Sequence, residues 1–254
     1  MKSAVETDAV EAAAAAGVEV RQLVSVEEQQ IARHIFDETW PGEGTQITPN
    51  LMQALSHNGA YVSAAFDANG RAIGAAFAFP GVDESGLHLH SHMAAVLPNI
   101  QNSNVGRALK FHQRAWAVQR GYHAIRWTFD PLVRRNAYLN IRKLGVDVIA
   151  YYENFYGEMP DAVNAGDYSD RLMVQWNLES EKASLAARGT LPAIDPSRGV
   201  VVELPEDIVA IRTQDKEKAL AFRLNVRQAL QSRFAEGWLI TGLTEEGNYV
   251  LERS

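Results

Sequence analysis

Three histidines occupy alternate positions in one predicted strand, residues 87–96. His88, His90 and His92 follow each other with a period of two, which places their imidazoles on one face of the strand. The ordinary pKa of histidine, about 6.5, suits proton removal at neutral pH. One imidazole could therefore act as a general base, or all three could be hydrogen-bonded and inert. A zinc site is disfavoured because zinc usually draws ligands from several elements, and no carboxylate is placed to complete this one.

The loop directly after this strand has the composition of an anion-binding site. Residues 101–106, QNSNVG, are mostly small or amide side chains, and they lead into an amphipathic helix predicted over about residues 104–120. The first N–H groups of a helix have no internal partner, and the helix dipole adds partial positive charge at that end. The pattern predicts a phosphate or pyrophosphate site, and hence a ligand that carries a nucleotide.

A second polar cluster begins the helix predicted over residues 133–144, just after the predicted strand 124–129. It contains Arg134, Arg135, Asn136 and Tyr138. A bidentate arginine can recognise a carboxylate, and the positive potential of a helix start adds to this. The two arginines are candidates for binding a substrate carboxylate; alternatively, they contact ligand phosphates or point into solvent.

The predicted elements follow the order β-α-α-β-β-β-α-β-α-β-β, which is typical of a mixed α/β layer fold. Residues 1–16 are expected to form a flexible tail, and residues 17–178 the main domain. Residues 179–198 are polar and predict a linker. The rest of the segment 179–254 predicts a small α/β extension. So small a segment is marginal alone, so we expect it to pack on the main domain or on a second subunit, as in a homodimer.

The run 96–106, VLPNIQNSNVG, resembles the motif V-x-P-x-x-(Q/R)-x-x-G-x-(G/A) of the GNAT superfamily of N-acetyltransferases. The element order over about residues 17–178 is similar as well. Asn104 stands where glycine is usual, but asparagine tolerates the left-handed backbone conformation better than other non-glycine residues. The segments FDPLVRRNAYLNIRKLG and YYENFYG further resemble a branch that includes suspected amino-acid N-acyltransferases, some of them succinyltransferases.

The resemblance implies a mixed, mostly antiparallel sheet flanked by helices, with acetyl-CoA or another acyl-CoA as co-substrate. The main chain of residues 93–96 would pair with the pantetheine arm, because this strand is expected to splay from its neighbour. The residues expected to contact coenzyme A are Ala95, Val96, Gln101, Asn102, Ser103, Asn104, Val105, Gly106, Arg107 and Asn136.

The resemblance also implies catalytic positions. In some members a glutamate six residues before the valine of the motif removes the proton of the amine, and His90 stands at that position. Many members have a tyrosine four residues before the glycine that closes the later helix. Ile141 occupies that position, and Tyr138 is the nearest substitute, one turn earlier. Arg134 and Arg135 would bind a carboxylate on the acceptor or on a succinyl donor.

Composition limits the remaining choices. The chain has 254 residues, a net charge of −7 and no cysteine. The acidic balance argues against nucleic acid as a partner, and the lack of cysteine excludes an acyl-cysteine intermediate. Without an apolar run long enough for a membrane span or a signal peptide, we expect a cytoplasmic protein. The sequence predicts a metal-free N-acyltransferase acting on a small amine or amino acid. The alternatives are an inactive coenzyme A-binding sensor or structural protein, and an interaction module.

Overall fold

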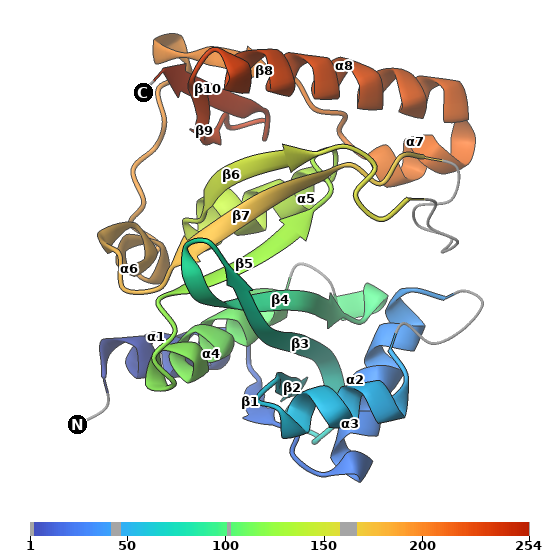
Figure 1. Ribbon diagram of the computed structural model, residues 1–254, viewed down its shortest axis with the longest axis vertical. Helices are drawn as coiled ribbons and strands as arrows, with labels where there is room; N and C mark the ends of the chain where they lie inside the picture. Colours follow the sequence, from blue (N-terminus) through green and yellow to red (C-terminus); the bar gives the residue numbers. More distant parts are fainter. Residues whose placement is uncertain (1–2, 42–46, 101–102, 158–166, 254) are drawn as a thin grey trace. The chain divides into compact units, whose positions relative to one another are not determined.

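The computed structural model describes residues 3–41, 47–100, 103–157 and 167–253 (Figure 1). The chain divides into two compact units. The first comprises Met1–Trp127 with Asn177–Ser180, and the second comprises Thr128–Trp176 with Glu181–Ser254. The predicted boundary between residues 178 and 179 is therefore not where the structure divides, because residues 128–176 pack with the C-terminal segment.

The first unit is a largely antiparallel sheet with helices on both faces, as predicted. Its strands, in spatial order, are β1 (Glu19–Gln22), β2 (Tyr61–Phe66), β3 (Ala72–Asp83), β4 (Gly86–Val96) and the start of β5 (Ala124–Phe129), which runs parallel to β4. Its helices are α1 (Ala4–Ala15), α2 (Val26–Thr39), α3 (Pro49–His57) and α4 (Val105–Gln119), with a short 3-10 turn, η1 (Pro98–Ile100).

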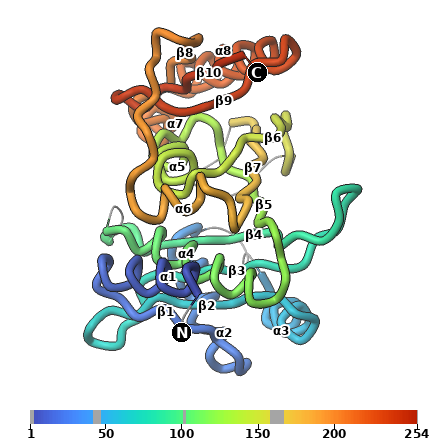
Figure 2. Tube along the Cα trace, turned by 90° about the vertical axis from the view of Figure 1, so that its left-hand side faces the viewer, coloured from blue at the N-terminus to red at the C-terminus, as the bar shows by residue number. Residues whose placement is uncertain are grey.

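The two faces of this sheet carry different helices. Phe77 of β3 and Met93 of β4 pack in one core with Phe36 of α2. On the opposite face, a Cβ atom at Gly74 would lie 3.1 Å from Val105 and 3.2 Å from Leu109 of α4, so this glycine permits close packing of α4 on β3. The tube in Figure 2 shows the long β3–β4 hairpin extending beyond these helices.

The N-terminal residues differ from the predicted flexible tail. Residues 4–15 form α1, whose first turn is closed by a capping box between Ser3 and Glu6. Its small buried residues, such as Ala12, let α1 lie against α4, and Asp8 forms an ion pair of 2.6 Å with Arg114. The alanine-rich sequence has little apolar contrast between its faces, so it gives no periodic signal of this packing.

The second unit contains a hairpin, several helices and a small sheet. Its elements are α5 (Arg134–Ala137), the π-helical turn η2 (Tyr138–Leu144), β6 (Asp147–Tyr152), β7 (Arg171–Asn177), α6 (Glu181–Ala187), the 3-10 turn η3 (Pro196–Arg198), β8 (Val200–Val202), α7 (Ile208–Gln214), α8 (Lys216–Ala235), β9 (Trp238–Leu243) and β10 (Tyr249–Arg253). Strands β6 and β7 are antiparallel, and the C-terminal sheet has the order β8-β10-β9. The predicted linker 179–198 contains α6, and α7 was not predicted.

A buried ion network holds the second unit together. Arg223 of α8 bonds Asp130 and Asp167 at 2.9 Å each, and Arg212 of α7 bonds the same two carboxylates. Burial alone would raise the pKa of Asp130, but the arginine charges and the hydrogen bond from Arg223 outweigh it and lower the pKa. The C-terminal helices thus neutralise carboxylates that residues 128–176 bury, which explains why these segments form one unit.

Replacing Arg223 with methionine should lower the free energy of unfolding by about 3–5 kcal/mol, because two buried carboxylates lose a partner. Arg233→Met is the matched control on the same helix. It removes an exposed pair with Glu236 (3.2 Å) and should cost less than about 1 kcal/mol. Urea unfolding of both variants checks this, and equal, small losses would show that the network does not stabilise the unit.

Candidate functional site

The predicted histidines share a face of β4, next to an irregularity in the strand. His90 is paired with Phe79 and Ser91 with Ala78, but Phe77 is opposite Met93, so His92 is an extra residue and forms a β-bulge. The ring of Phe79 lies 5.1 Å from that of His90 and 5.7 Å from that of His92, and the two imidazoles lie 6.0 Å apart. His90 and His92 share a face because they alternate along the strand, and the bulge also brings Met93 to the face that α2 covers.

Desolvation lowers the pKa of both imidazoles. The pKa of His90 falls to about 4, with further contributions from the charges of His92, His88 and Lys110. A neutral imidazole can accept a proton. Among the described residues, no cluster of three or more histidine, aspartate or glutamate side chains is arranged to hold a metal ion.

Strands β4 and β5 part soon after they meet. Their parallel pairing in the described structure comprises Leu89 with Ile125 and His90 with Arg126, whereas β4 continues to Val96 along β3. The outer edge of residues 93–96, which include Ala95 and Val96, therefore faces no strand in the part of the first unit that the structure describes. A peptide edge of this kind can pair with an extended ligand, as the sequence analysis expected for pantetheine.

Helix α4 begins a few residues beyond this parting. Asn104 has φ 64° and ψ 3°, the left-handed conformation that its sequence position requires, and the helix follows from Val105. Ser103 donates a hydrogen bond of 2.6 Å to the carbonyl of Ile100. Gly106 and Arg107 follow in the first turn, and the Arg107 guanidinium lies over the Phe111 ring at 4.6 Å. Gln101 and Asn102 lie outside the described residues.

Lys110 is a polar residue of the site that the sequence analysis missed. It is only 4% exposed on α4; its Nζ atom donates a hydrogen bond of 2.8 Å to Ser91 Oγ and lies 3.7 Å from the centroid of the Trp127 ring. Burial lowers the pKa of this lysine to about 7. The only available signal was a lysine between Leu109 and Phe111, on the apolar side of the helix.

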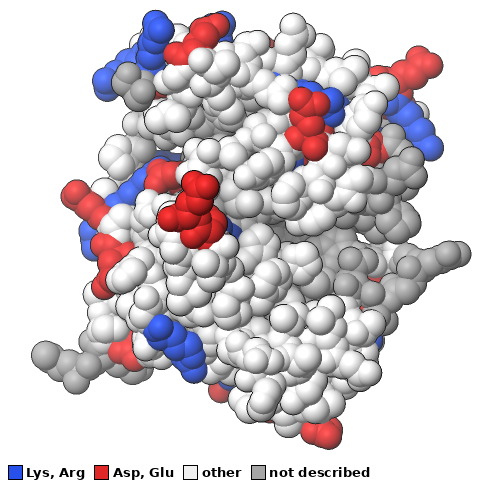
Figure 3. Space-filling model, in the orientation of Figure 1, with Lys and Arg blue, Asp and Glu red and all other residues white. Residues whose placement is uncertain are grey.

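The described helices contain no segment that is both long and apolar enough to cross a membrane. On the face shown in Figure 3, acidic and basic side chains are interspersed among uncharged ones.

Residues 29–145 match the family model described as "Acetyltransferase (GNAT) family". This part of the chain, which is less than half of its length, is therefore similar to the GNAT family. The match spans most of the first unit, including the β4–α4 segment, and ends at the glycine that follows the π-helical turn.

Solved structures show the same GNAT fold. The ribosomal-protein-S18-alanine N-acetyltransferase from Escherichia coli is 16% identical, with a TM-score of 0.50 over 64% of this chain and 95% of that one. The acetyltransferase of the GNAT family from Streptococcus pneumoniae is 14% identical, with a TM-score of 0.51 over 62% and 98% of the two chains. No curated protein matches the chain in sequence.

The second predicted cluster lies in the second unit, where the π-helical turn alters its geometry. Tyr138 is 47% exposed whereas Ile141 is 5% exposed, so the two do not share a helix face as predicted. The expectation assumed α-helical spacing, whereas a π-helix advances fewer degrees per residue. Ile141 is buried and apolar, so it offers no proton donor.

The two predicted arginines have different environments. Arg134 donates a hydrogen bond to the carbonyl of Leu204, and its aliphatic part packs where a Cβ atom at Gly247 would lie, 2.9 Å away. Arg135 is exposed, and Asn136 is half-buried. Arg134 is thus engaged by the C-terminal segment, whereas the side chain of Arg135 is exposed.

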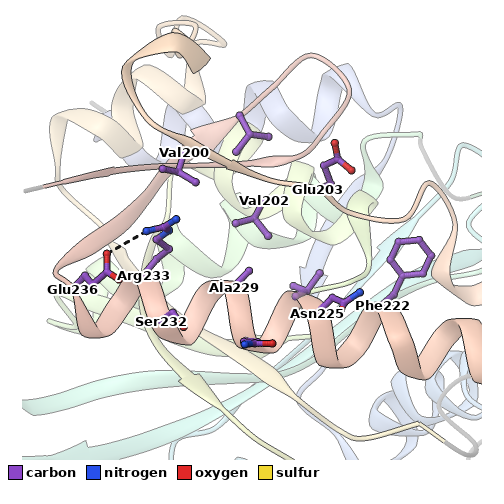
Figure 4. Close-up of a pocket in the computed structure, with 12 residues that line it drawn as sticks. Val200, Val202, Glu203, Phe222, Asn225, Ala229, Ser232, Arg233 and Glu236 are labelled. Carbon is purple, nitrogen blue, oxygen red and sulfur yellow. Dashed lines mark hydrogen bonds and ion pairs between the residues drawn. The ribbon is translucent and has the colours of Figure 1, made fainter.

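The second unit also has an open groove of about 630 Å³ between β8 and α8. Figure 4 shows Val200 and Val202 of β8 facing Ala229 and Phe222 of α8. None of the predicted site residues lines it, so the groove adds nothing to the chemistry of the GNAT motif.

The backbone of Asn104 provides a test of the loop. Asn104→Val should lower the stability of the protein by about 1–2 kcal/mol, because a β-branched residue is strained at this positive φ, and it should weaken coenzyme A binding. Asn104→Gly, the control, should retain both. Thermal unfolding with calorimetric titration of coenzyme A measures the two effects, and a fully stable Asn104→Val would contradict the assigned conformation.

Proposed function

We propose that this protein is an acyl-CoA-dependent N-acyltransferase that transfers an acyl group, acetyl or succinyl, to the amine of an amino acid or a close relative. The observation that carries the proposal is the parting of β4 from β5 just before a helix that starts with a left-handed residue. This arrangement offers a peptide edge for the pantetheine arm and the N-terminal N–H groups of a helix for the pyrophosphate.

Each part of the acyl-CoA donor has a candidate binding group in this chain. The main chain of Ala95 and Val96 would bond the pantetheine amides, and the segment from Gln101 to Arg107 would hold the pyrophosphate. Arg107 would add a charge-assisted contact. Asn136 is a candidate for a further polar contact with coenzyme A.

Transfer would occur by direct attack, because the chain has no cysteine to carry the acyl group. His90 would remove a proton from the substrate ammonium group to give the neutral amine that attacks, and backbone N–H groups of β4 would stabilise the oxyanion of the tetrahedral intermediate. The lowered pKa keeps the His90 ring neutral at pH 7, and it also makes the ring a weaker base than an ordinary histidine. The exposed Tyr138 is a weaker candidate for the acid than its sequence position implied.

Release of free thiol from acetyl-CoA and succinyl-CoA, measured against a panel of amino acids and simple amines, tests the function. Thiol release that requires both substrates is the expected result. If coenzyme A raises the unfolding temperature but no pair of acyl donor and amine reacts, the protein is an inactive coenzyme A-binding sensor. The apolar Ile141 is the observation that supports this alternative. Neither binding nor turnover would refute the proposal.

His90→Ala should lower kcat/KM by about 10²–10⁴-fold, the usual effect of losing a general base. Because the base works in its neutral form and burial brings its pKa to about 4, the rate should fall only as the pH approaches 4. With the ordinary histidine pKa of about 6.5, the rate would already fall near pH 6–7. His88→Ala and His92→Ala are the controls. Equal, small effects of all three changes would show that the histidines have no catalytic role. If the wild-type rate instead falls below pH 6–7, and only His92→Ala abolishes that fall, His92 is the base.

Arg135→Lys should reduce the preference for a carboxylate-bearing acceptor, because lysine cannot form the bidentate contact. The preference is the ratio of kcat/KM for an amino acid to that for its decarboxylated amine. Arg134→Lys is the comparison, since Arg134 is engaged by Leu204. If the simple amine is the better substrate in the wild type, or neither variant alters the ratio, the arginines do not select the acceptor.

A further inference from the structure

Lys110 lies at the point where β4 and β5 part. Its two contacts, Ser91 and Trp127, are the residues that directly follow the last paired residues of the two strands, His90 and Arg126. The amino group of Lys110 therefore lies beneath the opening between the strands, on the side of the sheet that α4 covers.

The histidines occupy the other face of the same strand. Ser91 is paired with Ala78, whereas His90 is paired with Phe79, so their side chains point to opposite sides of the sheet. Lys110 thus approaches the opening from one side and His90 from the other. A thioester bound between the strands would have a neutral base on one face and an ammonium group on the other.

The surroundings of Lys110 leave its charge uncompensated. Ser91 faces it from β4 and Trp127 from β5, His90 interacts with it only electrostatically from the opposite side of β4, and the nearby cations Arg114 and Arg126 are paired with Asp8 and Asp83. No carboxylate among the described residues pairs with Lys110. A buried unpaired ammonium is costly, so a group that becomes negative next to it during reaction would gain strongly from its presence.

We infer that Lys110 is the proton donor for the departing sulfur in the acyl transfer, an inference that depends on the proposed function. The amine nitrogen forms the C–N bond, the C–S bond breaks with its electron pair on sulfur, and the ammonium of Lys110 delivers a proton to that thiolate. His90 takes the proton that the amine loses, and solvent restores both groups.

The acidity of Lys110 fits the task. Its pKa of about 7 lies below the pKa of about 8.5 that is usual for a thiol, so transfer to the thiolate is downhill. The donor must be protonated, so kcat should fall as the pH rises above about 7.

Lys110→Met should lower kcat roughly 10²-fold or more at pH 7, leave KM for acyl-CoA within about twofold and abolish the alkaline fall of kcat. Lys110→Arg keeps the positive charge but cannot give up a proton near neutral pH, so it should not restore kcat. Lys218→Met, at an exposed lysine of α8, is the control and should behave as the wild type.

Measurements of kcat from pH 5 to 10 distinguish the outcomes, and thermal unfolding shows whether each variant is folded. Lys110 is not the proton donor if Lys110→Met keeps the wild-type kcat and its fall above pH 7, or if Lys110→Arg has the full rate. Either result would leave the proposed acyl transfer itself unaffected. If the wild type shows no acyl-CoA-dependent thiol release, the proposed function itself fails.

Discussion

The end of the pairing between β4 and β5 is the constraint on which the candidate site depends. After His90 and Arg126, β4 continues along β3 with its other edge free of any strand in the part of the first unit that the structure describes. Backbone N–H and C=O groups need partners, so this edge must be completed by water or by a ligand. The left-handed Asn104 lies directly before α4, so the first turn of that helix follows within a few residues of this edge.

The same constraint explains the unusual charges around the opening. His90 and His92 alternate along β4 and share one face, and α4 brings Lys110 to the other. Burial lowers the pKa of His90 and of Lys110, so a base stays neutral and a lysine becomes a moderate acid. Such desolvated groups reduce stability, which is the usual price of an active site. The C-terminal helices act differently, because they neutralise Asp130 and Asp167 and stabilise the second unit.

Local sequence signals predicted much of the first unit. Strand β5 has the predicted limits 124–129, and α4 (Val105–Gln119) lies within the predicted helix 104–120. Asn104 adopts the conformation that its place in the motif implied. Features that depend on tertiary contacts were not predictable: the alanine-rich α1 is held by α4, the π-helical turn separates Tyr138 from Ile141, and the acidity of Lys110 arises from its burial between α4 and the sheet. A single sequence does not reveal such packing.

Amide hydrogen exchange with and without coenzyme A tests the central claim most directly. If the ligand occupies the opening, the outward-facing amides of residues 93–96 and the first-turn amides of α4 should exchange more slowly when coenzyme A is bound, while those of β9 and β10 should not change. Slower exchange confined to other segments, or no change with coenzyme A at saturating concentration, would contradict the assignment of the site.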